Sequence, residues 1–101
     1  MTHNKLVRDH IPAIIQAGGH TPVTSVLDEE SYIAALHRKL DEEAAELHAD
    51  PCLEEMADLA EVLLALCEAH GYTAEELHAA QLKKRKERGG FRDRIFLHEV
   101  R

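Results

Sequence analysis

Aromatic residues are scarce in this sequence, which has no tryptophan, two tyrosines and two phenylalanines. A core must therefore come from Leu, Ala, Val and Ile, a composition typical of a helical domain rather than a β-sandwich. Cysteine is scarce as well. Cys52 and Cys67 fall in one predicted helix, roughly 22 Å apart by helix rise, so they cannot form a disulfide within it. We expect both to be reduced and buried as small apolar side chains.

Long apolar runs are also missing. The longest, Val62–Cys67, is far shorter than the roughly 20 residues of a membrane span, and the N-terminal "MTHNKLVRDH" has no apolar segment typical of a signal peptide. The net charge of −7 argues against general affinity for nucleic acid or for anionic membranes. A chain of 101 residues fits one domain, 1–101. We therefore expect a single cytoplasmic domain that binds neither nucleic acid nor membrane.

Proline and glycine are few and punctuate the predicted helices. A first short helix begins near Asp9, with Pro12 in its first turn, and ends at Gly18-Gly19. The residues that follow, 20–27, are rich in β-branched side chains and contain Pro22. They are predicted to form an extended arm.

Two further helices are delimited by capping signals. Asp28 caps a predicted helix over residues 29–48. Asp50 followed by Pro51 predicts the cap and first turn of the next helix, which ends near Gly71.

A capping box opens the last predicted helix. Thr73 and Glu76 have the required spacing, and Gly89-Gly90 ends the helix. The tail over residues 91–101 has no helical period, so it is either a docked strand-like segment or frayed. The predicted fold class is all-α, with four helices, an extended arm and a C-terminal tail.

Acidic residues are concentrated in residues 41–61, on both sides of a predicted turn. On a helical wheel, Glu43 falls within roughly 60° of the centre of the apolar stripe of the second helix. Glu55 lies inside the broad apolar arc of the third helix, and Asp58 lies at its edge. The opposite face carries acids at ordinary solvated positions, namely Glu54, Glu61 and Glu68.

The short connection between the second and third helices predicts an antiparallel hairpin. Glu46 and Glu55 are then equally far from the turn, as are Glu43 and Asp58, so four carboxylates meet at two levels, roughly 7 and 11 Å from the turn. Like charges this close raise one another's pKa or open the hairpin unless a cation neutralises them. Ligation by oxygen alone favours Mg²⁺ or Mn²⁺ over Zn²⁺.

The histidines offer no competing metal site. No two of the eight are three or four residues apart, and a di-iron bundle needs two Glu-x-x-His motifs, whereas this sequence has only one, Glu75-x-x-His78. A plain solvated hairpin supported by Glu–Lys pairs is the alternative to a metal site. The apolar-face positions of Glu43 and Glu55, together with the matched levels, favour the metal.

The pattern Glu42-Glu43-x-x-Glu46 followed by Glu55-x-x-Asp58 resembles the metal-binding signature of a known superfamily, the all-α nucleotide pyrophosphohydrolases. This superfamily includes MazG-type enzymes and phosphoribosyl-ATP pyrophosphatase. The N-terminal "NKLVRDHIP" and the C-terminal "KKRKERGGF" are similar to the ends of its short, single-domain branch. The resemblance therefore covers nearly the whole chain.

The resemblance implies a metal site and a substrate. Glu43, Glu46, Glu55 and Asp58 would bind Mg²⁺, for which Mn²⁺ can substitute, and the ion would hold the phosphates of a nucleotide. Glu42 and Glu43 are the implied catalytic residues, with Glu42 adding a metal contact or activating water.

Basic residues cluster at positions 83–88. They fit a nucleic-acid patch, a solvated helix end favoured by the helix dipole, or a phosphate clamp. Lys84 and Arg88 continue the face of the fourth helix predicted to point inward, so we expect them to contact phosphate. The resemblance adds Lys5 and Arg8 as weaker candidates.

The leading functional hypothesis is Mg²⁺-dependent hydrolysis of a nucleoside triphosphate to a monophosphate and pyrophosphate, which would remove unwanted nucleotides. The alternatives are phosphoribosyl-ATP pyrophosphatase of histidine biosynthesis and a noncatalytic helical module that binds metal or a partner. Base and sugar specificity stay open, because His10 replaces the more common Lys and only eight residues separate Glu46 from Glu55. The broad apolar face of the third helix predicts a homodimer or dimer of dimers, which would complete a MazG-like bundle.

Overall fold

The structure, a computed structural model, describes residues 4–101, so the first three residues of the predicted domain lie outside the described part. The described residues form four helices and no strand, which confirms the all-α prediction. The helices are α1 (Ile11–Ala17), α2 (Glu29–Ala49), α3 (Leu53–Ala69) and α4 (Ala74–Arg88).

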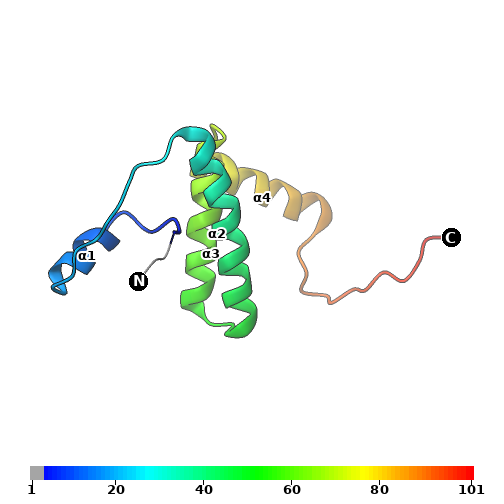
Figure 1. Cartoon of the computed structure of the whole chain (residues 1–101). Helices are drawn as coiled ribbons and strands as arrows, with labels where there is room; N and C mark the ends of the chain where they lie inside the picture. Colours follow the sequence, from blue (N-terminus) through cyan, green and yellow to red (C-terminus); the bar gives the residue numbers. More distant parts are fainter. Residues whose placement is uncertain (1–3) are drawn as a thin grey trace.

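An antiparallel hairpin of α2 and α3 forms the centre of the molecule (Figure 1). Its core is small and aliphatic, built on Leu36 of α2 and on Val62 and Leu66 of α3. Partly buried side chains pack around this core, and one of them, Leu6, comes from the N-terminal segment. The N-terminal arm, defined as residues 4–10, is thereby held against the hairpin.

Two of the predicted helix caps are present as expected. The Asp28 side chain accepts a hydrogen bond from the Ser31 backbone N–H at 2.8 Å, at the start of α2. Thr73 and Glu76 form the full capping box at the start of α4, with hydrogen bonds of 3.1 and 3.2 Å. Gly89 ends α4 with φ of 83°, a conformation that glycine adopts without steric cost.

The prediction for the turn between α2 and α3 is wrong. Asp50 does not cap α3; it follows the end of α2, and its backbone N–H donates to the Glu46 carbonyl at 3.0 Å. Pro51 lies in the connection and Cys52 is the N-cap residue of α3. The cause is local, because a residue before proline is disfavoured in helical conformation, and Asp50 has φ −146° and ψ 84°.

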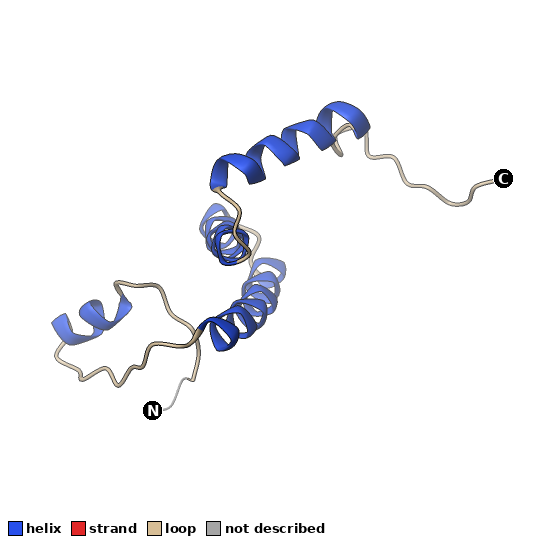
Figure 2. Ribbon diagram, turned by 90° about the horizontal axis from the view of Figure 1, so that it is seen from above, coloured by secondary structure: helices blue, strands red, loops and turns tan. Residues whose placement is uncertain are grey.

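The remaining helices extend away from the hairpin on two sides (Figures 1 and 2). Within the described chain α4 contacts only α3, and α1 contacts no other helix, so one chain does not form a four-helix bundle. The segment 20–27 forms neither helix nor strand and runs as an extended connection, as predicted (Figure 1). The tail beyond Gly90 is exposed throughout and is not a docked strand. Among the described helices, none combines the length and apolar character needed to cross a membrane.

Candidate metal site

Five acidic side chains of the hairpin form the acidic cluster, which is the candidate site. α2 supplies three of them and α3 supplies two: Glu42, Glu43, Glu46, Glu55 and Asp58. Two groups can each offer carboxylate oxygens within 4.8 Å of one another, and Glu43 belongs to both. All four predicted metal ligands therefore belong to one or both of these groups, but Glu46 is not in the group that contains Glu55 and Asp58.

Glu43 is the buried member of the acidic cluster. It is only 6% exposed, which confirms its predicted position on the core-facing side of α2. Its Oε1 atom pairs with Lys39, whereas its Oε2 atom is buried and has no hydrogen-bond partner among the described residues. Oε2 of Glu55 is also buried and also has no hydrogen-bond partner among the described residues.

These two buried oxygens are suited to act as ligands of a cation. Leaving a buried neutral polar group unsatisfied costs about 1–3 kcal/mol, and a charged group costs more. A divalent ion would satisfy both oxygens together. Carboxylates alone are a donor set that suits hard ions such as Mg²⁺, Mn²⁺ and Ca²⁺ rather than Zn²⁺.

Electrostatic repulsion within the acidic cluster affects the pKa of Glu46. The neighbouring Glu43 carboxylate raises the pKa of Glu46 above its usual value, and Glu55 and Glu42 add to this effect. Glu46 itself is exposed, so water reaches it. A bound cation would reverse the effect by favouring the ionised form.

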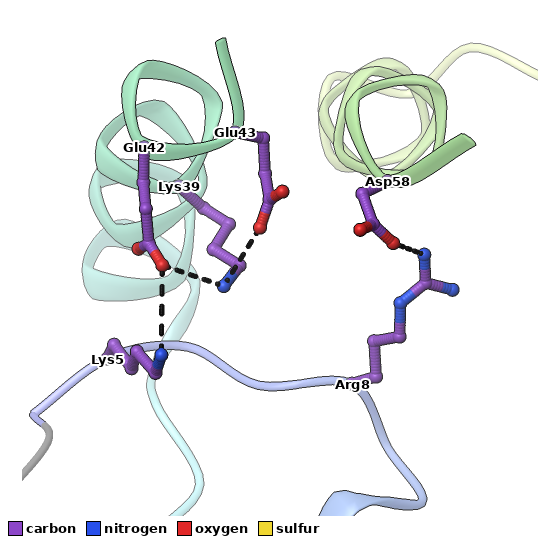
Figure 3. Close-up of polar contacts among 6 residues, drawn as sticks. All are labelled: Lys5, Arg8, Lys39, Glu42, Glu43 and Asp58. Carbon is purple, nitrogen blue, oxygen red and sulfur yellow. Dashed lines mark hydrogen bonds and ion pairs between the residues drawn. The ribbon is translucent and has the colours of Figure 1, made fainter. Parts of the chain in front are cut away.

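Lys39 is a residue of the candidate site that the sequence analysis missed. Its Nζ atom lies 3.2 Å from Glu43 and 3.4 Å from Glu42, and its side chain is only 17% exposed (Figure 3). Burial lowers the pKa of the Lys39 ammonium, but the Glu43 and Glu42 carboxylates outweigh burial and raise it. The signal was in the sequence, because Lys39 precedes these acids by three and four residues, the spacing of helical neighbours.

The N-terminal arm brings two more cations to the acidic cluster. Arg8 pairs with Asp58 at 2.6 Å, and Lys5 lies 3.8 Å from Glu42 (Figure 3). Both basic side chains are about half exposed, and ion pairs of this kind contribute roughly 0.2–1 kcal/mol. Two of the four residues predicted to contact phosphate, Lys5 and Arg8, thus lie next to the acidic cluster.

A cleft of about 650 Å³ lies between the N-terminal arm and the hairpin. Charged residues line part of it, and they comprise the basic Lys5, Arg8 and Lys39 and the acidic Asp9, Glu43, Asp58, Glu61 and Glu68. Apolar and aromatic side chains line the rest, including Leu6, Tyr32 and Val62. Sites for small molecules generally have this size and this combination of apolar walls with a few charged groups.

Lys84 and Arg88 are not brought to the acidic cluster within one chain. Both are exposed on α4, which leads away from the hairpin (Figure 2). In the described part of the chain, the ion pairs of the cluster involve only Lys5, Arg8 and Lys39. The helical pattern placed Lys84 and Arg88 on a face expected to point inward. Among the described helices, however, α4 contacts only α3.

Comparison with known proteins adds one relative. No family model matches the chain, and no solved structure matches it. An uncharacterized protein of Mycolicibacterium smegmatis is 58% identical over 45 residues. The aligned segment covers 45% of this chain and 46% of that protein, so less than half of either is matched. Membership of the pyrophosphohydrolase superfamily therefore stays a prediction from the sequence.

Proposed function

We propose that the chain is a Mg²⁺-dependent nucleoside triphosphate pyrophosphohydrolase, which cleaves the bond between the α and β phosphates. The observation that carries the proposal is the buried Glu43, which shares the acidic cluster with four further carboxylates and has one oxygen without a hydrogen-bond partner among the described residues. Such an arrangement fits a hard divalent cation. The adjacent cleft and its basic residues fit a polyphosphate ligand.

Each charged residue has a role in this proposal. Glu43, Glu46, Glu55 and Asp58 hold the ion. When bound, Mg²⁺ supplies positive charge that neutralises phosphate oxygens and makes the phosphorus easier to attack. Lys5 and Arg8 line the cleft and bind the phosphate oxygens that face them.

Glu42 is the proposed general base. Both of its ion pairs, with Lys5 and Lys39, are made through Oε1, which leaves Oε2 to accept a proton. As the water oxygen bonds to phosphorus, its proton passes to Glu42 and the α–β bridging bond breaks. The products are a monophosphate and pyrophosphate.

The cleft suggests how the nucleotide lies. Tyr32 and Glu43 both line it and are separated on α2 by roughly 16 Å of helix rise. With the phosphates at the acidic cluster, the base reaches the apolar part of the cleft near Tyr32. The aromatic ring there can stack on any base.

Pyrophosphate release tests the proposal. The purified chain is incubated with Mg²⁺ and a panel of ribo- and deoxyribonucleoside triphosphates that also includes phosphoribosyl-ATP. Preference for phosphoribosyl-ATP would assign the chain to that reaction instead. No release from any member of the panel would contradict the proposal and favour a noncatalytic binding module.

We propose a homodimer as the active form. Leu53, Met56 and Leu63 share one face of α3 and are 77%, 49% and 47% exposed. One chain buries few apolar side chains, so a second copy packed on this face would supply the missing core. Light scattering at increasing concentration tests this assembly, and a monomer at every concentration would contradict it.

A further inference from the structure

We propose that Lys39 acts as a built-in second cation, so that the acidic cluster binds one divalent ion per chain, at Glu43, Glu55 and Asp58. This inference rests on the proposed metal site. It adds the number of ions and assigns a role to Lys39. It also narrows the proposed ligands from four to three, because Glu46 belongs to the other group of carboxylates.

The arrangement of the carboxylates is one that could otherwise hold two ions. The first group, Glu42, Glu43 and Glu46, lies on α2, and the second group joins Glu43 to Glu55 and Asp58. Glu43 is shared, and two-metal sites need the ions close together, about 3.5–4 Å apart. A carboxylate that belongs to both ligand groups can bridge two ions at this separation.

Lys39 occupies the first group. Its ammonium lies between Glu42 and Glu43, and it contacts Oε1 of both. Figure 3 shows the Lys39 side chain reaching from the preceding turn of α2 to these two carboxylates. An ion in the first group would have to displace a largely buried ammonium from the same oxygen atoms.

The second group keeps unpartnered oxygens. Oε2 of Glu43 and Oε2 of Glu55 are both buried and without a hydrogen-bond partner among the described residues. Asp58 uses Oδ1 for Arg8, and Figure 3 shows its other oxygen on the side that faces Glu43. Each of Glu43 and Asp58 thus has one oxygen paired with a cation and one oriented toward the space between the helices.

The charges lead to the same number of ions. Five carboxylates and three paired cations leave two negative charges in the acidic cluster when all are ionised. One divalent ion balances them, whereas two would leave an excess of positive charge. Without Lys39, the first group would carry more negative charge and would have room for a second ion.

Titration with Mn²⁺ tests the inference, with stoichiometry read by calorimetry and by electron paramagnetic resonance. The wild-type chain should bind one Mn²⁺ and give the spectrum of an isolated ion. Lys39→Met should bind a second Mn²⁺ and show coupling between the two spins. Lys39→Arg should keep one ion, and Arg38→Met, at the exposed neighbouring position, serves as the matched control.

Two further variants decide the outcome if Lys39→Met does not fold, as judged by circular dichroism. Glu42→Gln should leave the affinity for the single ion little changed, whereas Glu55→Gln should lower it by at least about tenfold. Two ions in the wild type, or equal losses in these variants, would overturn the inference but leave the hydrolase proposal standing. No Mn²⁺ binding by the wild type would overturn both.

Discussion

The guanidinium group of Arg8 lies 2.6 Å from the carboxylate of Asp58, which ties the N-terminal arm to α3 across fifty positions of sequence. Both partners belong to the proposed site, one as a phosphate contact and one as a metal ligand. A metal ion bound as proposed would share Asp58 with the arm. Binding of the ion and binding of the arm would therefore be coupled.

Replacing Arg8 with Gln should affect metal and nucleotide binding in opposite directions. Without the guanidinium, Asp58 is free for the ion, so the affinity for Mg²⁺ should rise by up to about fivefold, the value of an exposed ion pair. Nucleotide affinity should fall because a phosphate contact is lost. Calorimetry measures both, and Arg38→Gln is the control. A loss of both affinities would show that Arg8 only supports the fold.

The helices and most of their caps were predictable because the signals are local. Asp28 and Thr73 hydrogen-bond to groups three residues away. Glu43 and Asp58 lie near each other because a short antiparallel connection places them at equal distances from the turn. The contact between Arg8 and Asp58 could not be predicted, because no periodicity connects an extended arm to a helix. The arm is positioned by Leu6, whose packing on the hairpin is tertiary.

Lys39 illustrates a different gap between sequence and structure. Its helical spacing from Glu42 and Glu43 was visible, but such a pair on a solvated face is an ordinary stabilising feature. Its importance comes from burial, since the Lys39 side chain is 17% exposed and the Glu43 side chain 8%. Burial depends on which face of α2 packs against α3 and the arm. The packed face is a property of the tertiary structure, which the spacing of residues along one helix does not reveal.

Glu43→Gln and Asp58→Asn should each lower turnover by at least about a hundredfold, since loss of groups that only support a metal ligand already costs roughly 10- to 100-fold. The helical circular dichroism spectrum should be retained. In the metal-free protein, Glu43→Gln should also raise the melting temperature, because a buried, partly unpaired charge is removed. Glu54→Gln, an exposed acid of α3, is the control. Full activity in both site variants would contradict the assigned roles.

In the metal-free protein, the contribution of Glu46 to stability should be lost as pH rises through its raised pKa. The folded state favours the protonated form of this carboxyl group. Its contribution is therefore fully present below the unfolded pKa, near 4.5, and is lost as the folded group ionises. Saturating Mg²⁺ should suppress this loss, because the ion favours the carboxylate.

Urea unfolding of the wild type and of Glu46→Gln, between about pH 4 and 7, isolates the contribution of Glu46. The difference in unfolding free energy between the two proteins should favour Glu46→Gln increasingly as pH rises in the presence of a chelator. Subtraction is necessary because Asp28 contributes with the opposite sign: its pKa is lowered by the hydrogen bond from the Ser31 backbone. A difference that does not vary with pH would contradict the repulsion inferred at Glu46.

Tyr32→Leu should weaken nucleotide binding while leaving metal affinity unchanged. Tyr32 lines the cleft and packs against the core of the hairpin, so Leu keeps an apolar side chain there but removes the ring. Stacking of a base on an aromatic side chain contributes about 1–3 kcal/mol, which corresponds to a loss of roughly 5- to 150-fold in affinity. The matched control is Tyr72→Leu, because Tyr72 is the other tyrosine of the sequence, is 58% exposed and is not among the residues that line this cleft. Fluorescence titration with a nonhydrolysable nucleotide and Mg²⁺ measures the effect; equal affinities for Tyr32→Leu and Tyr72→Leu would place the base elsewhere.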